Sequence, residues 1–366
     1  MNLFLEDILS QPAALRGALK KTDLEVIKPL RELIETGRVQ RVILTGMGAS
    51  FYGLYPAWLR LGGAGLSAIW VDAAELIHNA AALIDAHTLV WVASQSGCSA
   101  EVIGLLELCQ ERAPAALLAL TNDPHSPLGE AGAASPRALL LLIQAEAEHT
   151  PSTRTYSNTL ALSQLAAAAL IPASGAAPDL HAEWAELERT ADAIEAYLED
   201  WQGVLSRIAG AAAAGKPPDG ASRPAWALIG RGVSLASALA GALGLQEAAR
   251  IPALGMQAAQ FRHGPLEMSG AGLSVWVFEG QENSPEARLN RKLWSELRDL
   301  GANAWLLANP SSIGDGGAAL AHPSARGIGL PLAQVVPLQL LSYHLAEQAG
   351  FEPGTFRAVS KVTEIE

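Results

Sequence analysis

Two short segments of the chain share one pattern, ILTGMGAS at 43–50 and ALIGRGVS at 227–234. Each reads as a buried strand that runs into a glycine turn and ends on a serine where a helix begins. The shared positions are Gly46, Gly48 and Ser50 in the first copy and Gly230, Gly232 and Ser234 in the second. A strand that turns on glycines into a helix opens many doubly wound α/β sheets. The repeat therefore predicts two such sheets in one chain, produced by a duplication.

Apolar runs of strand length follow each copy of this corner and alternate with stretches that can form helices. The expected strands are 66–72, 88–95, 116–123 and 138–145 in the first half, and 273–280 and 303–310 in the second. Such alternation predicts an α/β fold with two doubly wound, mostly parallel sheets, each flanked by helices. Functional side chains are then expected at the carboxyl ends of the strands.

The predicted organisation has five parts. Residues 1–37 are expected to form two amphipathic helices, and 38–205 a first domain that ends in a linker helix within a helical stretch at 157–201. A linker is expected at 206–223 because this region is rich in small residues, proline and glycine. The second domain is expected at 224–345, followed by a C-terminal tail at 346–366.

The charge balance excludes one class of partner. Acidic residues number 37 against 25 basic ones, and no Lys/Arg block could follow a nucleic-acid backbone. Two cysteines cannot form a disulfide framework, the N-terminus has no signal-peptide pattern, and the Ala/Leu run at 160–171 is too short to cross a bilayer. We expect a cytoplasmic protein that binds neither nucleic acid nor membrane.

The glycine corner also invites a dinucleotide-binding interpretation, with Asp72 at the end of the next strand as the ribose-binding acid. The third glycine of that motif is replaced by Phe51 in the first copy and by Leu235 in the second. That glycine lets helix and strand pack closely, so its replacement argues against a nicotinamide cofactor.

Hydroxyl groups gather after the strand at 88–95. Ser94, Gln95 and Ser96 lie in the loop, and Ser99 is the expected N-cap of the next helix. Hydroxyls and free N–H groups at the positive end of a helix can bind an anion. Ordinary capping and turn chemistry would explain the same residues.

A further hydroxyl-rich stretch, TPSTRTYSNT at 150–159, also follows an expected strand. Ser152 and Thr153 could cap the helix after it. Several such clusters at the strand ends of one sheet favour a site for a phosphate or a polyol.

Proton-transfer groups occur in the second half. Glu247 lies on an otherwise apolar helix, and His263 precedes a Gly-Pro turn. A carboxylate with an imidazole can move protons between carbon and oxygen, as an aldose–ketose conversion requires. A solvated helical glutamate and a turn histidine are the alternative. In the tail, nothing intrinsic distinguishes Lys361.

Taken together, these motifs resemble the sugar isomerase (SIS) domain family in its tandem form. They are TGMGASFY, SQSGCSAE, PSTRTYSNT, FRHGP and SKVTEIE. The resemblance extends from about residue 38 onward and is greatest to the isomerase half of glucosamine-6-phosphate synthase and to stand-alone amino-sugar-phosphate deaminases. It implies a sugar phosphate as ligand, no metal or organic cofactor, and a homodimer.

The resemblance also implies a role for each matching residue. The sugar phosphate and its neighbouring hydroxyls would contact Ser50, Ser94, Gln95, Ser96, Ser99, Ser152 and Ser360. Glu247 would move the proton between C1 and C2 through an enediol or enolamine. His263, donated across the dimer interface, would open the sugar ring. Lys361 would close over the substrate carbonyl and form an imine there.

No glutaminase domain precedes the matching region, so we expect deamination of an amino-sugar phosphate to a ketose phosphate, or plain isomerisation, and not glutamine-dependent synthesis. Three charged residues usual in the family are replaced by Ala240, Gly244 and Gln260. There are two alternatives: a non-catalytic regulator that binds a phosphosugar, and a deglycase that releases a bulkier amine.

Overall fold

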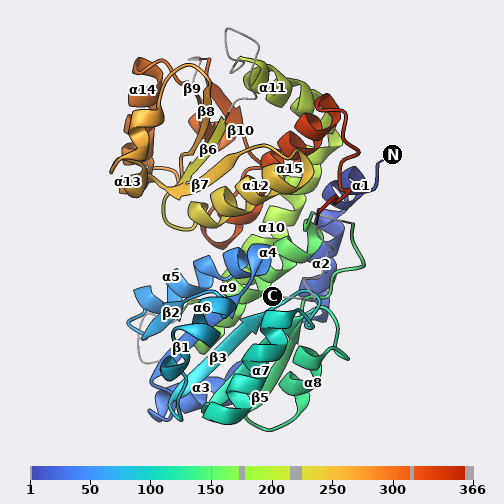
Figure 1. The fold of residues 1–366 in the computed structure, drawn as a ribbon, viewed down its shortest axis with the longest axis vertical. Coiled ribbons are helices and arrows are strands. Elements are labelled where there is room, and N and C mark those ends of the chain that lie inside the picture. The colour runs from blue at the N-terminus through green and yellow to red at the C-terminus, as the bar shows by residue number, and fades with distance from the viewer. Residues whose placement is uncertain (1, 150, 173–177, 215–224, 314–316, 359–366) are drawn as a thin grey trace. The chain divides into compact units, whose positions relative to one another are not determined.

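The computed structural model describes residues 2–149, 151–172, 178–214, 225–313 and 317–358. The chain divides into two compact units, each built on its own parallel sheet (Figure 1). The first-sheet unit consists mainly of Ala14–Ala147 and Arg154–Ala185. The second-sheet unit consists of Glu186–Phe356, the segment Glu148–Thr153 and the N-terminal segment up to Ala13.

Five parallel strands form the first sheet, in the order β2-β1-β3-β4-β5. They are β1 Arg41–Gly46, β2 Ala68–Trp70, β3 Thr88–Ala93, β4 Ala116–Thr121 and β5 Ala138–Leu142. On β3, Leu89 and Trp91 pack into one hydrophobic cluster while Val90 and Val92 pack into another. Burial on both faces explains why these strands read as continuous apolar runs in the sequence.

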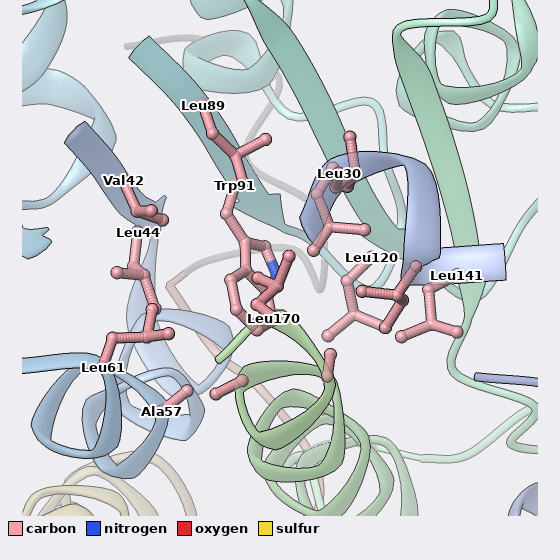
Figure 2. Close-up of a cluster of buried hydrophobic side chains, with 14 of the residues drawn as sticks. Leu30, Val42, Leu44, Ala57, Leu61, Leu89, Trp91, Leu120, Leu141 and Leu170 are labelled. Atoms are coloured by element: carbon pink, nitrogen blue, oxygen red, sulfur yellow. The ribbon is translucent and has the colours of Figure 1, made fainter. Parts of the chain in front are cut away.

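Helices cover both faces of this sheet. One layer contains α3 (Lys28–Glu35), α5 (Tyr55–Gly63) and α9 (Arg154–Leu170), and the other contains α6 (Ala73–His78), α7 (Ala100–Arg112) and α8 (Pro127–Ala133). Figure 2 shows the first layer, where Trp91 on β3 and Leu44 on β1 lie among leucines such as Leu61 of α5 and Leu170 of α9. The first unit is therefore doubly wound, as predicted.

The second sheet has the same topology, since its order β10-β9-β8-β6-β7 repeats that of the first sheet read from the opposite edge. Its parallel strands are β6 Ala225–Gly230, β7 Ala253–Gln257, β8 Leu273–Phe278, β9 Asn303–Ala308 and β10 Ala319–Ala321. The sequence did not predict β7 or β10. The two sheets confirm the fold class and the duplicated plan.

Helices also flank the second sheet. They are α11 (Trp201–Ala213), α12 (Ser234–Ala248), α13 (Ala258–Phe261), α14 (Pro285–Asp299) and α15 (Leu330–Gln348), and α1 (Leu3–Leu9) packs against α15. On one face, α13 and α14 contribute Phe261 and Leu293 to the core. On the other face, a Cβ at Gly241 of α12 would overlap Leu338 of α15 and lie 3.0 Å from Leu228 of β6. This glycine therefore permits close packing of α12 against α15.

Some expected boundaries differ from the structure. The stretch 157–201 contains most of α9 and a separate helix, α10 (Leu180–Glu199). Residues 206–213, expected to be linker, are the second half of α11. The N-terminal region contains α2 (Gln11–Lys21) and a short 3-10 turn in addition to α1 and α3. Apolar periodicity locates a helical stretch, but the points at which one helix ends and the next begins depend on capping and tertiary contacts.

One segment, Gly327–Gln348, is long and apolar enough to cross a membrane by length and composition. Its most apolar window is 94% buried inside the protein. A core helix has the same composition because every face of it meets apolar neighbours. We therefore describe α15 as a core helix of the second-sheet unit.

Candidate functional site

The carboxyl ends of β1 and β3 form the topological switch point of the first sheet. The chain leaves β1 for β2 on one side and returns to β3 on the other. The loops after β1 and β3 therefore diverge and leave a crevice in which ligands of open α/β sheets usually bind. Ser50 follows β1, and the loop 94–99, which we call the serine loop, follows β3.

Glycines shape the turn after β1. A Cβ on Gly46 would lie 2.5 Å from the carbonyl oxygen of Ala93 at the end of β3, so only glycine fits there. Gly48 has φ +51°, a left-handed conformation that glycine adopts without strain. These two positions start the short helix α4 (Gly48–Gly53) immediately, and Ser50 lies half-buried in its first turn.

Hydrogen bonds hold the serine loop in shape. The N–H of Gly97 donates to Ser94 Oγ at 3.1 Å, and the N–H of Cys98 donates to Ser96 Oγ at 3.4 Å. The carbonyl of Gln95 accepts from the N–H of Asn122 at 3.1 Å. Ser94 and Ser96 act as acceptors in these contacts, so each retains its own hydroxyl hydrogen for a ligand.

Ser99 is the N-cap residue of α7 by position, as the sequence predicted, with φ −66° and ψ 160°. Its side chain makes no capping hydrogen bond. The first N–H groups of α7 also have no partner within the helix, because no carbonyl precedes them at the required spacing. The start of this 13-residue helix therefore offers N–H groups and a hydroxyl to an anion.

The two cysteines have different environments. Cys98 is exposed in the serine loop, whereas Cys109 is buried on α7. Burial raises the pKa of the Cys109 thiol to about 12, because a thiolate is poorly solvated in an apolar interior. Only Cys98 is therefore available to reagents in solution.

Two residues of the dinucleotide interpretation have structural roles. The carboxylate of Asp72 accepts the N–H of Glu75 at 2.9 Å and so caps α6. The ring of Phe51 stacks on Trp70 at 4.0 Å between centroids. The position at which a dinucleotide fold needs glycine is thus filled by an aromatic pair. In the described part of the chain, no group of three or more His, Cys, Asp or Glu side chains could hold a metal ion.

Ser152 lies half-buried just before α9, in the segment Glu148–Thr153 of the second-sheet unit. Thr153, the other expected cap, donates its hydroxyl and its N–H to the Glu148 carboxylate, both at 3.2 Å. Ser360 and Lys361 lie outside the described residues.

The second-sheet unit contains the two expected proton-transfer groups. Glu247 is half-buried in the last turn of α12. His263 is exposed in a turn between α13 and the 3-10 helix Pro265–Met268. Gly264 has φ +125°, so this turn requires glycine, and Arg262 ties its start to Glu296 of α14 at 2.6 Å. The imidazole of His263 is therefore exposed to solvent on a turn whose backbone is held in place.

The second copy of the glycine corner, at 227–234, offers no accessible serine. Ser234, the counterpart of Ser50, is fully buried. Glu279 follows β8 as Ser94 follows β3, and its buried carboxylate pairs with Arg291 of α14 at 2.6 Å. Ser284 caps α14 by accepting the N–H of Ala287 at 3.0 Å. A buried acid and a capped helix oppose phosphate binding at this switch point, so the serine chemistry is specific to the first sheet.

The sequence model of the SIS domain family matches residues 38–169. A glutamine–fructose-6-phosphate aminotransferase (isomerizing) from Methanothermobacter thermautotrophicus is 29% identical over 375 residues, covering 100% of this chain and 58% of the relative. The chain thus spans little more than half the length of that relative.

Two solved structures share the whole fold. The C-terminal domain of glucosamine-fructose-6-phosphate aminotransferase from Francisella tularensis superposes with a TM-score of 0.79 at 18% identity, covering 96% of each chain. Glucosamine-6-phosphate deaminase from Thermotoga maritima has a TM-score of 0.72 at 18% identity, covering 99% of each chain. Residues 38–169 thus match the SIS domain family, and the chain shares the fold of these structures, with two parallel sheets of one topology.

Proposed function

We propose that this protein is a sugar-phosphate isomerase of the SIS type that acts on an amino-sugar phosphate such as glucosamine 6-phosphate, releasing ammonia and a ketose phosphate. One observation supports this most strongly. At the switch point of the first sheet, the hydroxyls of Ser94, Ser96 and Ser99 lie in the loop that leads into an uncapped helix start, where N–H groups favour an anion without a lysine cluster. The names of the similar proteins supply the substrate class.

The proposed chemistry needs one base and one ring-opening group. With the ring open, the Glu247 carboxylate removes the proton from C2 and returns it to C1 through an enolamine. The C2–N bond becomes an iminium, water adds to it, and ammonia leaves as the C2 carbonyl forms. His263 would assist ring opening, and Lys361 would close over C2, where its amine can add to the iminium in place of water, expel ammonia and leave a C2 imine that water then hydrolyses to the ketone.

We also propose that the protein acts as a homodimer in the cytoplasm. The exposed His263 turn suits donation to the site of a second copy, as the family resemblance implies. A dimer would then be required for activity, and mixing two inactive variants, Glu247→Gln and His263→Asn, should restore part of it.

The test is an ammonia-release assay on glucosamine 6-phosphate with Glu247→Gln. We expect loss of turnover by at least about 100-fold, the typical contribution of a general base, with sugar-phosphate binding retained. Glu188→Gln, which removes the same charge from an exposed site on α10, serves as the matched control. Unchanged turnover in Glu247→Gln would refute the assigned base. Tight binding without turnover in the unmodified protein would identify a sensor instead.

A further inference from the structure

The second-sheet unit has a polar pocket of its own, lined in part by the loop that follows β8. Its volume is about 450 Å³, and it is lined by the loops after β8, β9 and β10 together with the first part of α10. All of its lining residues belong to this unit. We call it the second-sheet pocket. A volume of this size accommodates a phosphorylated monosaccharide.

Two arginines supply the positive charge of the pocket. Glu186, whose side chain is only 13% exposed, accepts from Arg189 at 2.7 Å and from Arg326 at 3.2 Å. The carboxylate thus fixes both guanidinium groups from one side. Each guanidinium has five N–H donors, so the outward edges of both remain available to a phosphate, which guanidinium groups bind in a bidentate manner.

The pocket also contains a negative charge on the side of the β8 loop. Glu282 lies in the loop after β8 and accepts the Ser311 hydroxyl at 3.1 Å through one oxygen. The pocket therefore contains two arginines and two glutamates. A lining with balanced charges in separate places complements a ligand that itself has both charges, because each charged group of the ligand then meets its opposite.

Neutral polar groups complete the lining, and the loops that bear them are fixed. Asn309 is buried, donates to the carbonyl of Ala325 at 3.0 Å and accepts its N–H at 3.2 Å. Gln281 accepts the N–H of Gly327 at 2.8 Å. Loops tied to one another in this way form a preorganised pocket, and Ser324 contributes a hydroxyl to it.

We propose that the second-sheet pocket binds an amino-sugar phosphate at a site distinct from the serine loop. The phosphate contacts the outward edges of Arg189 and Arg326, the ammonium group faces Glu282, and the sugar hydroxyls contact the amides and hydroxyls between them. The ligand proposed for this pocket is the same compound as the proposed substrate, so the choice of ligand rests on the proposed function. The pocket chemistry itself does not depend on catalysis at the first sheet.

Calorimetric titration of glucosamine 6-phosphate into the full-length Glu247→Gln protein tests this proposal, since that background prevents turnover. We expect two sites per chain. Arg326→Gln, at a side chain that is 71% exposed and so not needed for folding, should weaken one site at least about tenfold. Glucose 6-phosphate, which lacks the amine, should bind this site more weakly, and Glu282→Gln should abolish the difference.

The matched control is Lys292→Gln, which removes one positive charge from the exposed face of α14 outside the pocket and should leave both sites intact. Ser96→Ala with Ser99→Ala should weaken only the other site. A single site that is lost in the serine variant and unaffected by Arg326→Gln would overturn the proposal and leave the proposed function standing. A single site lost only in Arg326→Gln would support the pocket and count against the serine loop.

Discussion

Gly97 in the serine loop provides the sharpest test of how the candidate site is held. Its φ is +66°, and a Cβ there would overlap Ser126 Oγ and lie 2.8 Å from Thr121 Oγ1. Gly97→Ala therefore incurs a left-handed backbone cost of about 1 to 2 kcal/mol. It also displaces Ser126, which caps α8 by accepting the N–H of Gly129 at 3.2 Å, at a cost of about 0.5 to 2 kcal/mol.

The expected loss in unfolding free energy is thus about 1.5 to 4 kcal/mol, measured by urea denaturation with tryptophan fluorescence. Ser126→Gly in the same background removes the overlap, and a glycine cap costs only a few tenths of a kcal/mol, so the double variant should regain about 1 kcal/mol. Sugar-phosphate affinity should fall in the single variant because the loop moves.

Gly104→Ala is the matched control on α7. Only Ile77 Cδ1, at 3.5 Å, lies within 4 Å of its Cβ position, so alanine should stabilise the helix by about 0.5 to 1 kcal/mol. A change in stability of less than about 0.5 kcal/mol in Gly97→Ala, or a double variant no more stable than the single one, would refute the role assigned to this glycine.

Three further predictions follow from the described environments. Iodoacetamide should alkylate Cys98 but not buried Cys109 in the native protein, and glucosamine 6-phosphate should slow the reaction; equal labelling by mass spectrometry would contradict this. Burial lowers the pKa of His322 to about 4, whereas a histidine in the unfolded chain has a pKa of about 6.5. As pH falls below about 6.5, the unfolded chain therefore binds a proton that the folded chain does not, and the free energy of unfolding should fall by roughly 2 kcal/mol between pH 6.5 and 5. Urea denaturation at the two pH values measures this loss, and His322→Asn should remove it. Arg291→Met should destabilise the second-sheet unit by about 2 to 3 kcal/mol because Glu279 is left buried without its partner, and adding Glu279→Gln should recover part of the loss in the same denaturation assay.

The longer strands could be predicted because they are continuous apolar runs between turn signals, as in β3 and β8. The strand β7 was missed because Gly255 interrupts its pattern. That glycine is needed since a Cβ there would lie 2.7 Å from Leu239 Cα, a contact invisible in the sequence. The strand β10 has only three residues, too few for any periodicity.

The serine loop could be predicted from turn and capping chemistry, which is local in sequence. The free hydroxyl of Ser99 could not, because the same residue type caps α14 at Ser284 and the difference lies in side-chain orientation. The ion pair between Glu279 and Arg291 joins groups brought together only by the fold. Glu247 and His263 were assigned through family resemblance, since no local pattern distinguishes a catalytic glutamate from a solvated one.

A helix whose first turn is left unfinished is less stable alone than with something bound to it. Because Ser99 does not complete α7, an arriving phosphate would supply the acceptors that the polypeptide omits, and the ligand would become a temporary part of the secondary structure. Occupancy and folding of the first unit would then be linked, so that the protein resists heat and proteolysis best when its metabolite is plentiful.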